Sequence, residues 1–333
     1  RDLWQQLDGL AARTWLIDQV GQQAYDVIWD PLLRVKFGEY HDRVSAAWIW
    51  HRIHRVARSR RHLWEREHFG YLELGSETVI SALAERLQQM PNVQLRSRTR
   101  VKSIETHEGQ VSGVLLVDGE RIPCEYVIST VALPVLLKLA PDLDPGYRAQ
   151  LEQIDYLGVV CGLFKLRQSV TDSYWVNIND PDIPFNGIIE YSNLNKHLNL
   201  GDKVILYIPY YLRTSVPRFS YSDEHLYREF IDGLKRINPA FDESWVEEYH
   251  VSRAAYAQAI CHVGFAAIVP GHETPLKGLY ITDSTQFYPE DRTISAAIRL
   301  GRRVAGLIQD QQMTVPATAG VPARLQETRQ HAR

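Results

Sequence analysis

A short strand, a loop and an amphipathic helix near the carboxyl end restrict the fold more than any other segment. Gly278 to Asp283 has the apolar character of a buried strand, and Ile294 to Ile308 has helical periodicity. Its opposite face carries Arg299, Arg302 and Arg303. A buried strand followed by a one-sided helix predicts an α/β fold in which the helix packs on a sheet. The apolar or small residues recur at helical spacing, at Ile294, Ala297, Ile298, Gly301, Ala305 and Ile308.

The end of this strand and the start of this helix form a predicted ligand site. Asp283 stands at the carboxyl end of the strand, where ligands of open α/β sheets bind, and can accept hydrogen bonds from a ribose or another polyol. Thr293 and Ile294 begin the helix, whose free N–H groups and partial positive charge suit an anionic or electron-rich group. An ordinary strand, loop and helix closing a sheet would look the same, so both interpretations stay open.

Three segments carry a family resemblance. Gly278 to Ile308 resembles the carboxy-terminal FAD-binding segment of the flavin amine oxidase, protoporphyrinogen oxidase and phytoene desaturase superfamily. Tyr71 to Gly75, with the helical stretch Ser76 to Met90, resembles the glycine turn and helix before the middle FAD-domain strands. Tyr126 to Pro134 resembles the strand that ends in Ser-Thr-Val-x-x-Pro. The resemblance implies FAD as cofactor and a Rossmann-like FAD/NAD(P)-binding domain with an interleaved α+β substrate domain.

One expected motif is absent from the sequence. In the resembling family a G-x-G-x-x-G turn lets the backbone approach the FAD pyrophosphate. No two glycines of this chain stand two positions apart, and Arg1 and Asp2 lead directly into what resembles the substrate-domain helices. We therefore expect an amino-terminally truncated chain with an incomplete Rossmann-like domain, and the sequence leaves the activity of such a chain open.

The resemblance and the local patterns together give a domain plan. Residues 1–69 are expected to form substrate-domain helices, and residues 70–140 part of the FAD domain with a β-meander. Residues 141–272 return to the substrate domain, and residues 273–312 form the carboxy-terminal FAD-binding strand and helix. The Pro- and Gly-containing end, residues 313–333, is expected to be disordered.

Periodicity and turn residues place the individual elements. Helices are predicted over 10–20, over 24–35 with a break at Pro31, over 44–58, and over 223–237 with Ser222 as its cap. A β-meander is predicted from five short strands, with turns at Glu108-Gly109 and Asp118-Gly119. Pro141 and Pro145 are taken as a crossing between domains. The meander strands cover residues 93–95, 101–106, 111–117, 121–123 and 126–129.

Val101 is a candidate for contact with the adenine. The stretch Arg98 to Ile104 resembles the family strand in which the backbone N–H and C=O of an apolar residue hold the adenine edge. An ordinary edge strand accounts for the same pattern equally well.

A group of basic residues follows in the third predicted helix and beyond it. His51 and His54 share a helical face but lack a further ligand at a usable spacing, so a metal site is disfavoured. A solvated basic helix end is the plain interpretation, and an arginine-lined mouth for an anionic substrate is the alternative. The group comprises His51, Arg52, His54, Arg55, Arg58, Arg60, Arg61 and His62.

Tyrosines supply candidates for a substrate cleft between the two domains. Tyr210, Tyr256 and Tyr288 are the residues predicted to face it. Core or interface packing with a wet hydroxyl is the competing interpretation for each of them.

Composition narrows the class of protein. The chain has 333 residues, 45% of them apolar, which is enough for a large core in two domains. A net charge of -3 gives no general attraction to nucleic acid. Three cysteines without metal spacing, and no apolar run long enough to span a bilayer, indicate a cytoplasmic protein with reduced thiols. Peripheral membrane contact and oligomeric state stay open.

Three functions are compatible with these observations. The favoured one is an FAD-dependent oxidoreductase that transfers hydride from an organic small molecule to the flavin. The second is a non-redox flavin isomerase that resembles the UDP-galactopyranose mutases. The third is a non-catalytic fragment unable to hold FAD. The substrate, the electron acceptor and any catalytic acid or base are not determined by the sequence.

Overall fold

A computed structural model describes residues 3–58, 70–198 and 201–314 of the chain. Residues 1–292 form one compact unit and residues 293–333 form another. The first unit holds all of the strands, and the helix α11 is the described part of the second. None of the described helices combines the length and the apolar character needed to cross a membrane.

The chain begins with helices, as predicted, but their boundaries differ. Pro31 does not break a helix: it lies in the first turn of α4, where proline is tolerated because its missing N–H has no partner to lose. The residues before it form a π-helix, so the predicted single helix over 24–35 is three joined segments. The elements are α1 (Trp4–Leu7), α2 (Ala12–Val20), α3 (Gln22–Ala24), the π-helix η1 (Tyr25–Trp29), α4 (Asp30–Phe37), the 3-10 turn η2 (Gly38–Tyr40) and α5 (Ala46–Arg58).

The predicted β-meander is present with one strand fewer. Residues 93–95 form no strand, because Val93 instead donates its N–H to the carbonyl of Met90 at 3.1 Å in a turn. The turn at Glu108-Gly109 has positive φ angles of 49° and 75°, which match the right-handed twist of a two-residue hairpin. The elements are α6 (Glu77–Gln88), β1 (Val101–His107), β2 (Gln110–Leu116), β3 (Arg121–Pro123) and β4 (Val127–Ser129), with β1, β2 and β3 in one antiparallel sheet.

Strand β4 pairs in parallel with β10 (Leu279–Ile281), so the chain leaves this pair after Ser129 and returns to it at Leu279. The departing segment is helical: α7 (Leu133–Leu139) is followed by α8 (Pro145–Glu152). Pro145, predicted together with Pro141 to mark a crossing between domains, stands at the start of a helix. Asp144 caps α8 by accepting the N–H of Tyr147 at 2.9 Å, and Pro145 takes the first helical position.

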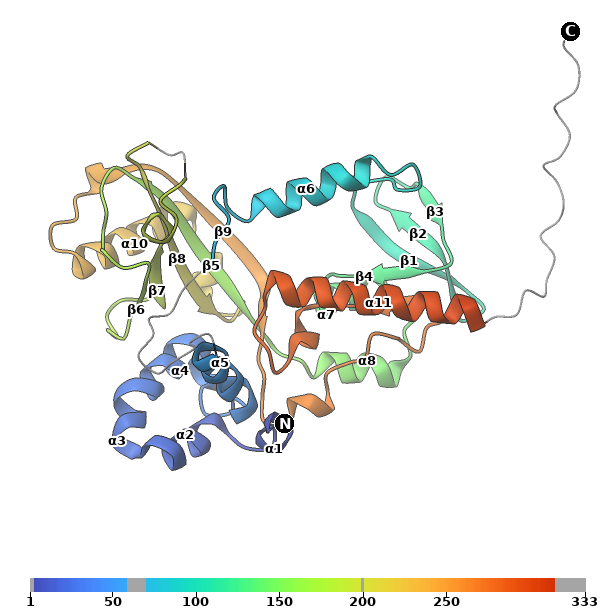
Figure 1. Ribbon diagram of the computed structural model, residues 1–333, viewed down its shortest axis with the longest axis horizontal. Coiled ribbons are helices and arrows are strands. Elements are labelled where there is room, and N and C mark those ends of the chain that lie inside the picture. The colour runs from blue at the N-terminus through green and yellow to red at the C-terminus, as the bar shows by residue number, and fades with distance from the viewer. Residues whose placement is uncertain (1–2, 59–69, 199–200, 315–333) are drawn as a thin grey trace, which may run out of the picture. The chain divides into compact units, whose positions relative to one another are not determined.

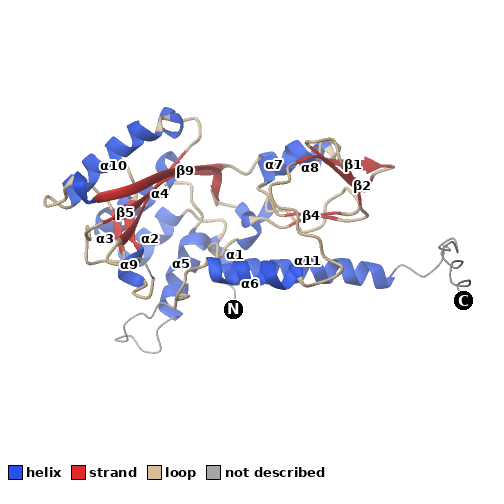
Figure 2. Cartoon of the chain, turned by 90° about the horizontal axis from the view of Figure 1, so that it is seen from above, coloured by secondary structure: helices blue, strands red, loops and turns tan. Residues whose placement is uncertain are grey.

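The segment between α8 and β10 forms a five-stranded sheet with the order β6-β7-β8-β5-β9 (Figures 1 and 2). Helix α10 packs against it, and Ser222 caps that helix through the N–H of His225, as predicted. The elements are β5 (Tyr156–Leu166), β6 (Trp175–Asn177), β7 (Gly187–Glu190), α9 (Tyr191–Leu194), β8 (Val204–Leu212), the turn η3 (Pro217–Ser220), α10 (Asp223–Ile237), the turn η4 (Glu243–Trp245), β9 (Val246–Ala259), the turn η5 (Phe265–Ala267) and the turn η6 (Ser284–Phe287).

Alternation along β8 assigns its two faces different roles. Leu206 and Ile208 are fully buried in a core that includes Phe230 of α10. Tyr207, Pro209 and Tyr211 lie on the opposite face, because successive side chains of a strand point to opposite sides. That opposite face is the one available to the amino-terminal helices.

The second unit is described only through helix α11 (Ile294–Thr314). Residues 313 and 314 belong to this helix, so the predicted disordered end begins too early. Residues 315–333 lie outside the described residues.

Gly278 is expected to be the least replaceable glycine of the parallel pair. Its φ is +85°, and a Cβ there would lie 2.4 Å from the carbonyl oxygen of Glu125. Gly278→Ala should therefore lower the free energy of unfolding by about 2–4 kcal/mol, since backbone strain and overpacking add. Gly271→Ala is the matched control, because a Cβ at Gly271 meets nothing within 4 Å. Equal losses of stability for the two variants in urea unfolding would contradict this account.

Candidate functional site

Asp283 lies where the sequence predicts it, directly after β10, but its carboxylate is bound within the protein. It is 7% exposed. Its Oδ1 accepts the N–H of Thr285 at 3.0 Å and also the Thr285 hydroxyl, and its Oδ2 accepts the hydroxyl of Tyr156 at 3.3 Å. Burial raises the pKa of Asp283 although these bonds oppose that rise. Asp283 therefore caps the turn η6 and ties it to β5.

The other predicted cofactor contacts occupy ordinary structural positions. Thr293 caps α11, since its Oγ1 accepts the N–H of Ala296 at 3.1 Å, and Ile294 is the first residue of that helix. Val101 begins β1, an edge strand of the antiparallel sheet, and is 38% exposed. Their contacts with FAD stay predictions.

The described residues provide only part of an FAD site. A dinucleotide needs a glycine turn that brings backbone N–H groups to the pyrophosphate, and no glycine pair of this sequence has that spacing. The carboxylate of Asp283 is already occupied by donors from Thr285 and Tyr156. The strand, the turn and the helix start are present, but these residues do not fit the complete cofactor.

The three tyrosines predicted for one cleft lie in three different places. Tyr256 packs edge-on against Tyr156, with ring centroids 5.6 Å apart. Tyr288 donates its hydroxyl to Asp8 and is bound to Ser45 at 2.8 Å, so it joins its loop to the amino-terminal helices. Tyr210 lines a large cavity of the first unit.

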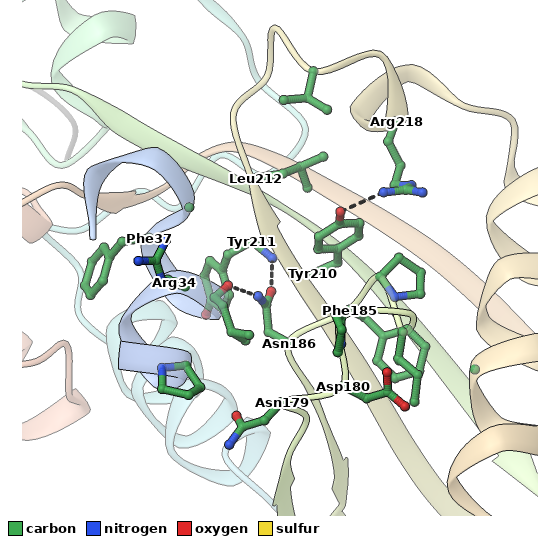
Figure 3. A pocket seen from close by; sticks show the side chains of 18 of the residues that line it. Arg34, Phe37, Asn179, Asp180, Phe185, Asn186, Tyr210, Tyr211, Leu212 and Arg218 are labelled. Carbon is green, nitrogen blue, oxygen red and sulfur yellow. Dashed lines mark hydrogen bonds between the residues drawn. The ribbon is translucent and has the colours of Figure 1, made fainter. Parts of the chain in front are cut away.

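Tyr210 belongs to what we term the α10 cavity, of about 1060 Å³, between α4, the 179–186 loop and α10 (Figure 3). Its hydroxyl accepts a hydrogen bond from Arg218 at 2.8 Å. Every arginine that lines this cavity has a carboxylate partner. The ion pairs are Arg34 with Asp30 at 2.5 Å, Arg213 with Glu39 at 2.5 Å, Arg218 with Glu229 at 3.0 Å, and Arg236 with Asp182 at 3.2 Å.

Asn186 forms the wall between this cavity and a second one. Its Nδ2 donates to the carbonyl oxygen of Val35 in α4, and its Oδ1 accepts the N–H of Tyr211 in β8 (Figure 3). Both neighbours line both cavities. One side chain thus fixes α4 against the central strand β8.

The second cavity, here called the Lys36 cavity, has a volume of about 830 Å³. Helices α4 and α5 form one wall, and the face of β6, β7 and β8 opposite α10 forms the other. Asp291 and Arg292, which precede α11 in sequence, also line it. The apolar and aromatic lining consists of Trp29, Leu32, Leu33, Val35, Phe37, Trp48, Ile49, Ile53, Ala57, Trp175, Gly187, Pro209 and Tyr211.

Lys36 is the unusual group of this cavity. Its Nζ lies 4.6 Å from the ring centroid of Trp48 and 5.7 Å from that of Phe37. Among the described residues it has neither a hydrogen bond nor a carboxylate partner within ion-pair distance. Burial, reinforced by the positive charge of Arg52, lowers the pKa of Lys36 to about 7.

The remaining charges of the Lys36 cavity are mostly positive. Arg52 pairs with Asp291 at 2.8 Å, and these neighbouring cations hold the pKa of the Asp291 carboxyl below its usual range. Arg292 donates to the amide oxygen of Gln258 at 3.1 Å, and Arg55 also lines the cavity. One carboxylate therefore faces several cations.

The basic group at residues 51–62 is divided by the fold. Arg52 and Arg55 face the Lys36 cavity, whereas His54 stacks on Trp50 with centroids 4.5 Å apart. Within residues 3–58, 70–198 and 201–314, no cluster of three or more His, Cys, Asp or Glu side chains could hold a metal ion. Arg60, Arg61 and His62 lie outside the described residues, as does the side chain of Arg58.

Sequence reasoning did not identify Lys36. A signal was nevertheless present, because Trp29, Leu32, Leu33 and Lys36 recur at helical spacing. A lysine in the apolar stripe of a helix must either reach solvent along its stem or occupy a cavity.

One family model matches most of the chain, and one curated protein matches part of it. The sequence profile of the family described as flavin containing amine oxidoreductase matches residues 5–309. The 4,4'-diaponeurosporene oxygenase of Staphylococcus aureus (strain MRSA252) is 30% identical over 109 residues, which are 30% of this chain and only 22% of the oxygenase.

Solved structures show the same fold at low identity. An oxidoreductase from Methanosarcina mazei has a TM-score of 0.67 at 16% identity, and reduced UDP-galactopyranose mutase has 0.69 at 14% identity. In both cases the match covers 90% of this chain and 68% of the other. The predicted Rossmann-like fold with an interleaved α+β portion is thereby confirmed.

Because the pKa of Lys36 is lowered, replacing this lysine should raise the free energy of unfolding by an amount that depends on pH. Below pH 7 the folded protein bears the full cost of the buried charge, so Lys36→Met should be more stable than the parent. Above pH 7 the folded state releases that proton while the unfolded chain keeps it, so the difference should narrow. Between pH 7 and 8.5 it should shrink by up to about 2 kcal/mol. Urea unfolding of both proteins at each pH measures this difference in the free energy of unfolding. Lys102→Met, which replaces an exposed lysine, is the control. A difference independent of pH would contradict the assignment.

Proposed function

This chain belongs to the flavin containing amine oxidoreductase family, and we propose that it takes part in FAD-dependent oxidation of an organic small molecule. The family match across residues 5–309 is the observation that carries the proposal. The flavin supplies the hydride acceptor in such chemistry. Since the described residues do not form a complete FAD site, the proposal for this chain concerns the binding and orientation of the substrate.

The Lys36 cavity is the place proposed for that substrate. Its size lies within the range of small-molecule sites, and it combines apolar walls with a few converging polar groups. Asp291 and Arg292 line it and stand immediately before Thr293 and Ile294, the predicted flavin contacts. The aromatic walls would exclude water, and the cations would fix the orientation of a polar end.

The α10 cavity is a weaker candidate despite its larger volume. Its arginines already have carboxylate partners, so a charged ligand would have to break an ion pair to bind there. In the Lys36 cavity Arg52 is paired with Asp291, but an anion could bind Lys36, Arg55 or Arg292 without breaking an ion pair.

A non-redox isomerase is the second proposed function. The cations of the Lys36 cavity would suit the phosphates of a nucleotide sugar, and reduced UDP-galactopyranose mutase shares the fold. Redox chemistry is preferred, because it is the commoner use of a flavin.

The test of the proposed function begins with the protein from its natural source, with whatever segments accompany these 333 residues. We expect a yellow protein with a flavin spectrum, and bleaching of that spectrum on anaerobic mixing with substrate, followed by recovery in air. A preparation that stays colourless with excess FAD would contradict the cofactor assignment. Turnover that needs prior reduction and consumes no electron acceptor would instead establish the isomerase.

A further inference from the structure

We propose that the Lys36 cavity recognises an anionic amphiphile, a ligand with an apolar or aromatic body and one acidic head group. The inference names the substrate class of the proposed oxidoreductase and rests on that function only for its biological meaning. The binding itself follows from the cavity and can be measured without flavin.

The apolar walls specify the body of the ligand. Trp29, Leu32 and Leu33 come from the amino-terminal helices, and Trp175, Pro209 and Tyr211 come from the facing strands. Trp29, Leu32 and Leu33 form a continuous apolar stripe. Contact with an apolar ligand body would remove this surface from water, which favours binding.

The cations specify the head group. Lys36 is half-buried against the ring of Trp48 and has no hydrogen bond or ion pair within the described residues, although the charge of Asp291 is near, so an anion in the cavity would find a cation free to pair with it. Asp291 already pairs with Arg52, so it leaves the charges of Lys36, Arg55 and Arg292 without a carboxylate of their own in the cavity. A carboxylate, sulfonate or phosphate on the ligand would supply that missing partner.

Aromatic rings hold two of the cations at the wall. Trp48 has the Nζ of Lys36 at 4.6 Å and the Cζ of Arg52 at 5.7 Å from its ring. Such contacts orient a cation without neutralising it, because the ring carries no net charge. The positive groups thus remain available to a ligand that also packs on the ring.

A matched pair of probes separates the head group from the body. 1-Octanesulfonate carries a permanent negative charge, and 1-octanol has the same chain without the charge. Calorimetric titration should show the sulfonate binding to the full chain at least about tenfold more tightly than the alcohol, as a charge-assisted contact implies. Equal affinities would overturn the proposal.

Substitution of Lys36 tests whether this side chain contacts the acidic head group of the ligand. Lys36→Met should weaken the sulfonate about tenfold while leaving the alcohol within about twofold, since only a charged partner is lost. Lys102→Met, on the exposed strand β1, should change neither affinity. Near-ultraviolet circular dichroism confirms that each variant is folded. Should Lys36→Met not fold, Arg292→Gln provides the same comparison. The assignment would be overturned if Lys36→Met weakened the binding of sulfonate and alcohol equally. It would also be overturned if Lys102→Met weakened sulfonate binding as much as Lys36→Met does.

The pH dependence adds a readout that a purely structural lysine would not give. Sulfonate affinity should fall as the pH rises from 6 to 8.5, because Lys36 loses its proton while the probe keeps its charge. The groups near Lys36 are Arg52, Asp291, Arg292 and Cys261. Arginine stays charged, Asp291 stays ionised, and burial raises the pKa of the Cys261 thiol, which stays neutral. The slope should vanish in Lys36→Met.

These outcomes are independent of the flavin assignment. A protein that binds octanesulfonate but no FAD would retain this inference and lose the proposed oxidoreductase. A flavoprotein that binds the sulfonate no better than the alcohol would retain the oxidoreductase and lose the anionic substrate class.

Discussion

The parallel pairing of β4 with β10 is the constraint on which the first unit depends. Two segments remote in sequence must meet in register, Val127 with Leu279 and Ser129 with Ile281. Everything between them is a long excursion that begins and ends at this pair: α7 and α8 lead away from it, and β9 leads back. Gly278 permits the pairing, because the carbonyl of Glu125 lies where any side chain would start.

The contact of one amino-terminal helix, α4, with the five-stranded sheet creates the chemical environment of the candidate site. Asn186 binds α4 to β8 through two backbone groups, and Lys36 is thereby held between two helices and a sheet. The two cavities on either side of this contact differ in charge balance as well as in size. One has its arginines paired with carboxylates, and the other buries a lysine that has none. A cation left without an ion-pair partner in a cavity is more informative about function than a large volume, because an acidic ligand can pair with it without breaking an existing ion pair.

Elements with strong local signals could be predicted from the sequence. Helix α10 has both a serine cap and a continuous apolar stripe, and the hairpin turns have residues suited to positive φ. Where two local signals competed, the sequence left the local structure open: Asp144-Pro145 begins a helix, although prolines also mark linkers. The fold class was accessible because the strand and helix at 278–308 resemble a known family.

The residues of the candidate site could not be predicted from the sequence in the same way. Asp283 has the right position, but only its hydrogen bonds to Thr285 and Tyr156 show that its carboxylate is already in use. Lys36, Arg52 and Asp291 come from three separate parts of the sequence, and their meeting depends on tertiary contacts that no local pattern encodes. The contacts of Tyr210, Tyr256 and Tyr288 also depend on the tertiary fold, since a tyrosine in a sequence gives no sign of which cavity it will face.

The protonation of Lys36 in the folded protein is the measurement that tests this account most directly. Nuclear magnetic resonance of side-chain amino groups in 15N-lysine-labelled protein, with Lys36 assigned from the spectrum of Lys36→Met, follows its titration residue by residue. The account predicts a titration midpoint near pH 7 in the free protein, and a rise of that midpoint when 1-octanesulfonate is added, because the bound anion favours the charged form. A midpoint near that of an exposed lysine, or one that the sulfonate leaves unchanged, would contradict a buried, unpaired cation awaiting an acidic ligand.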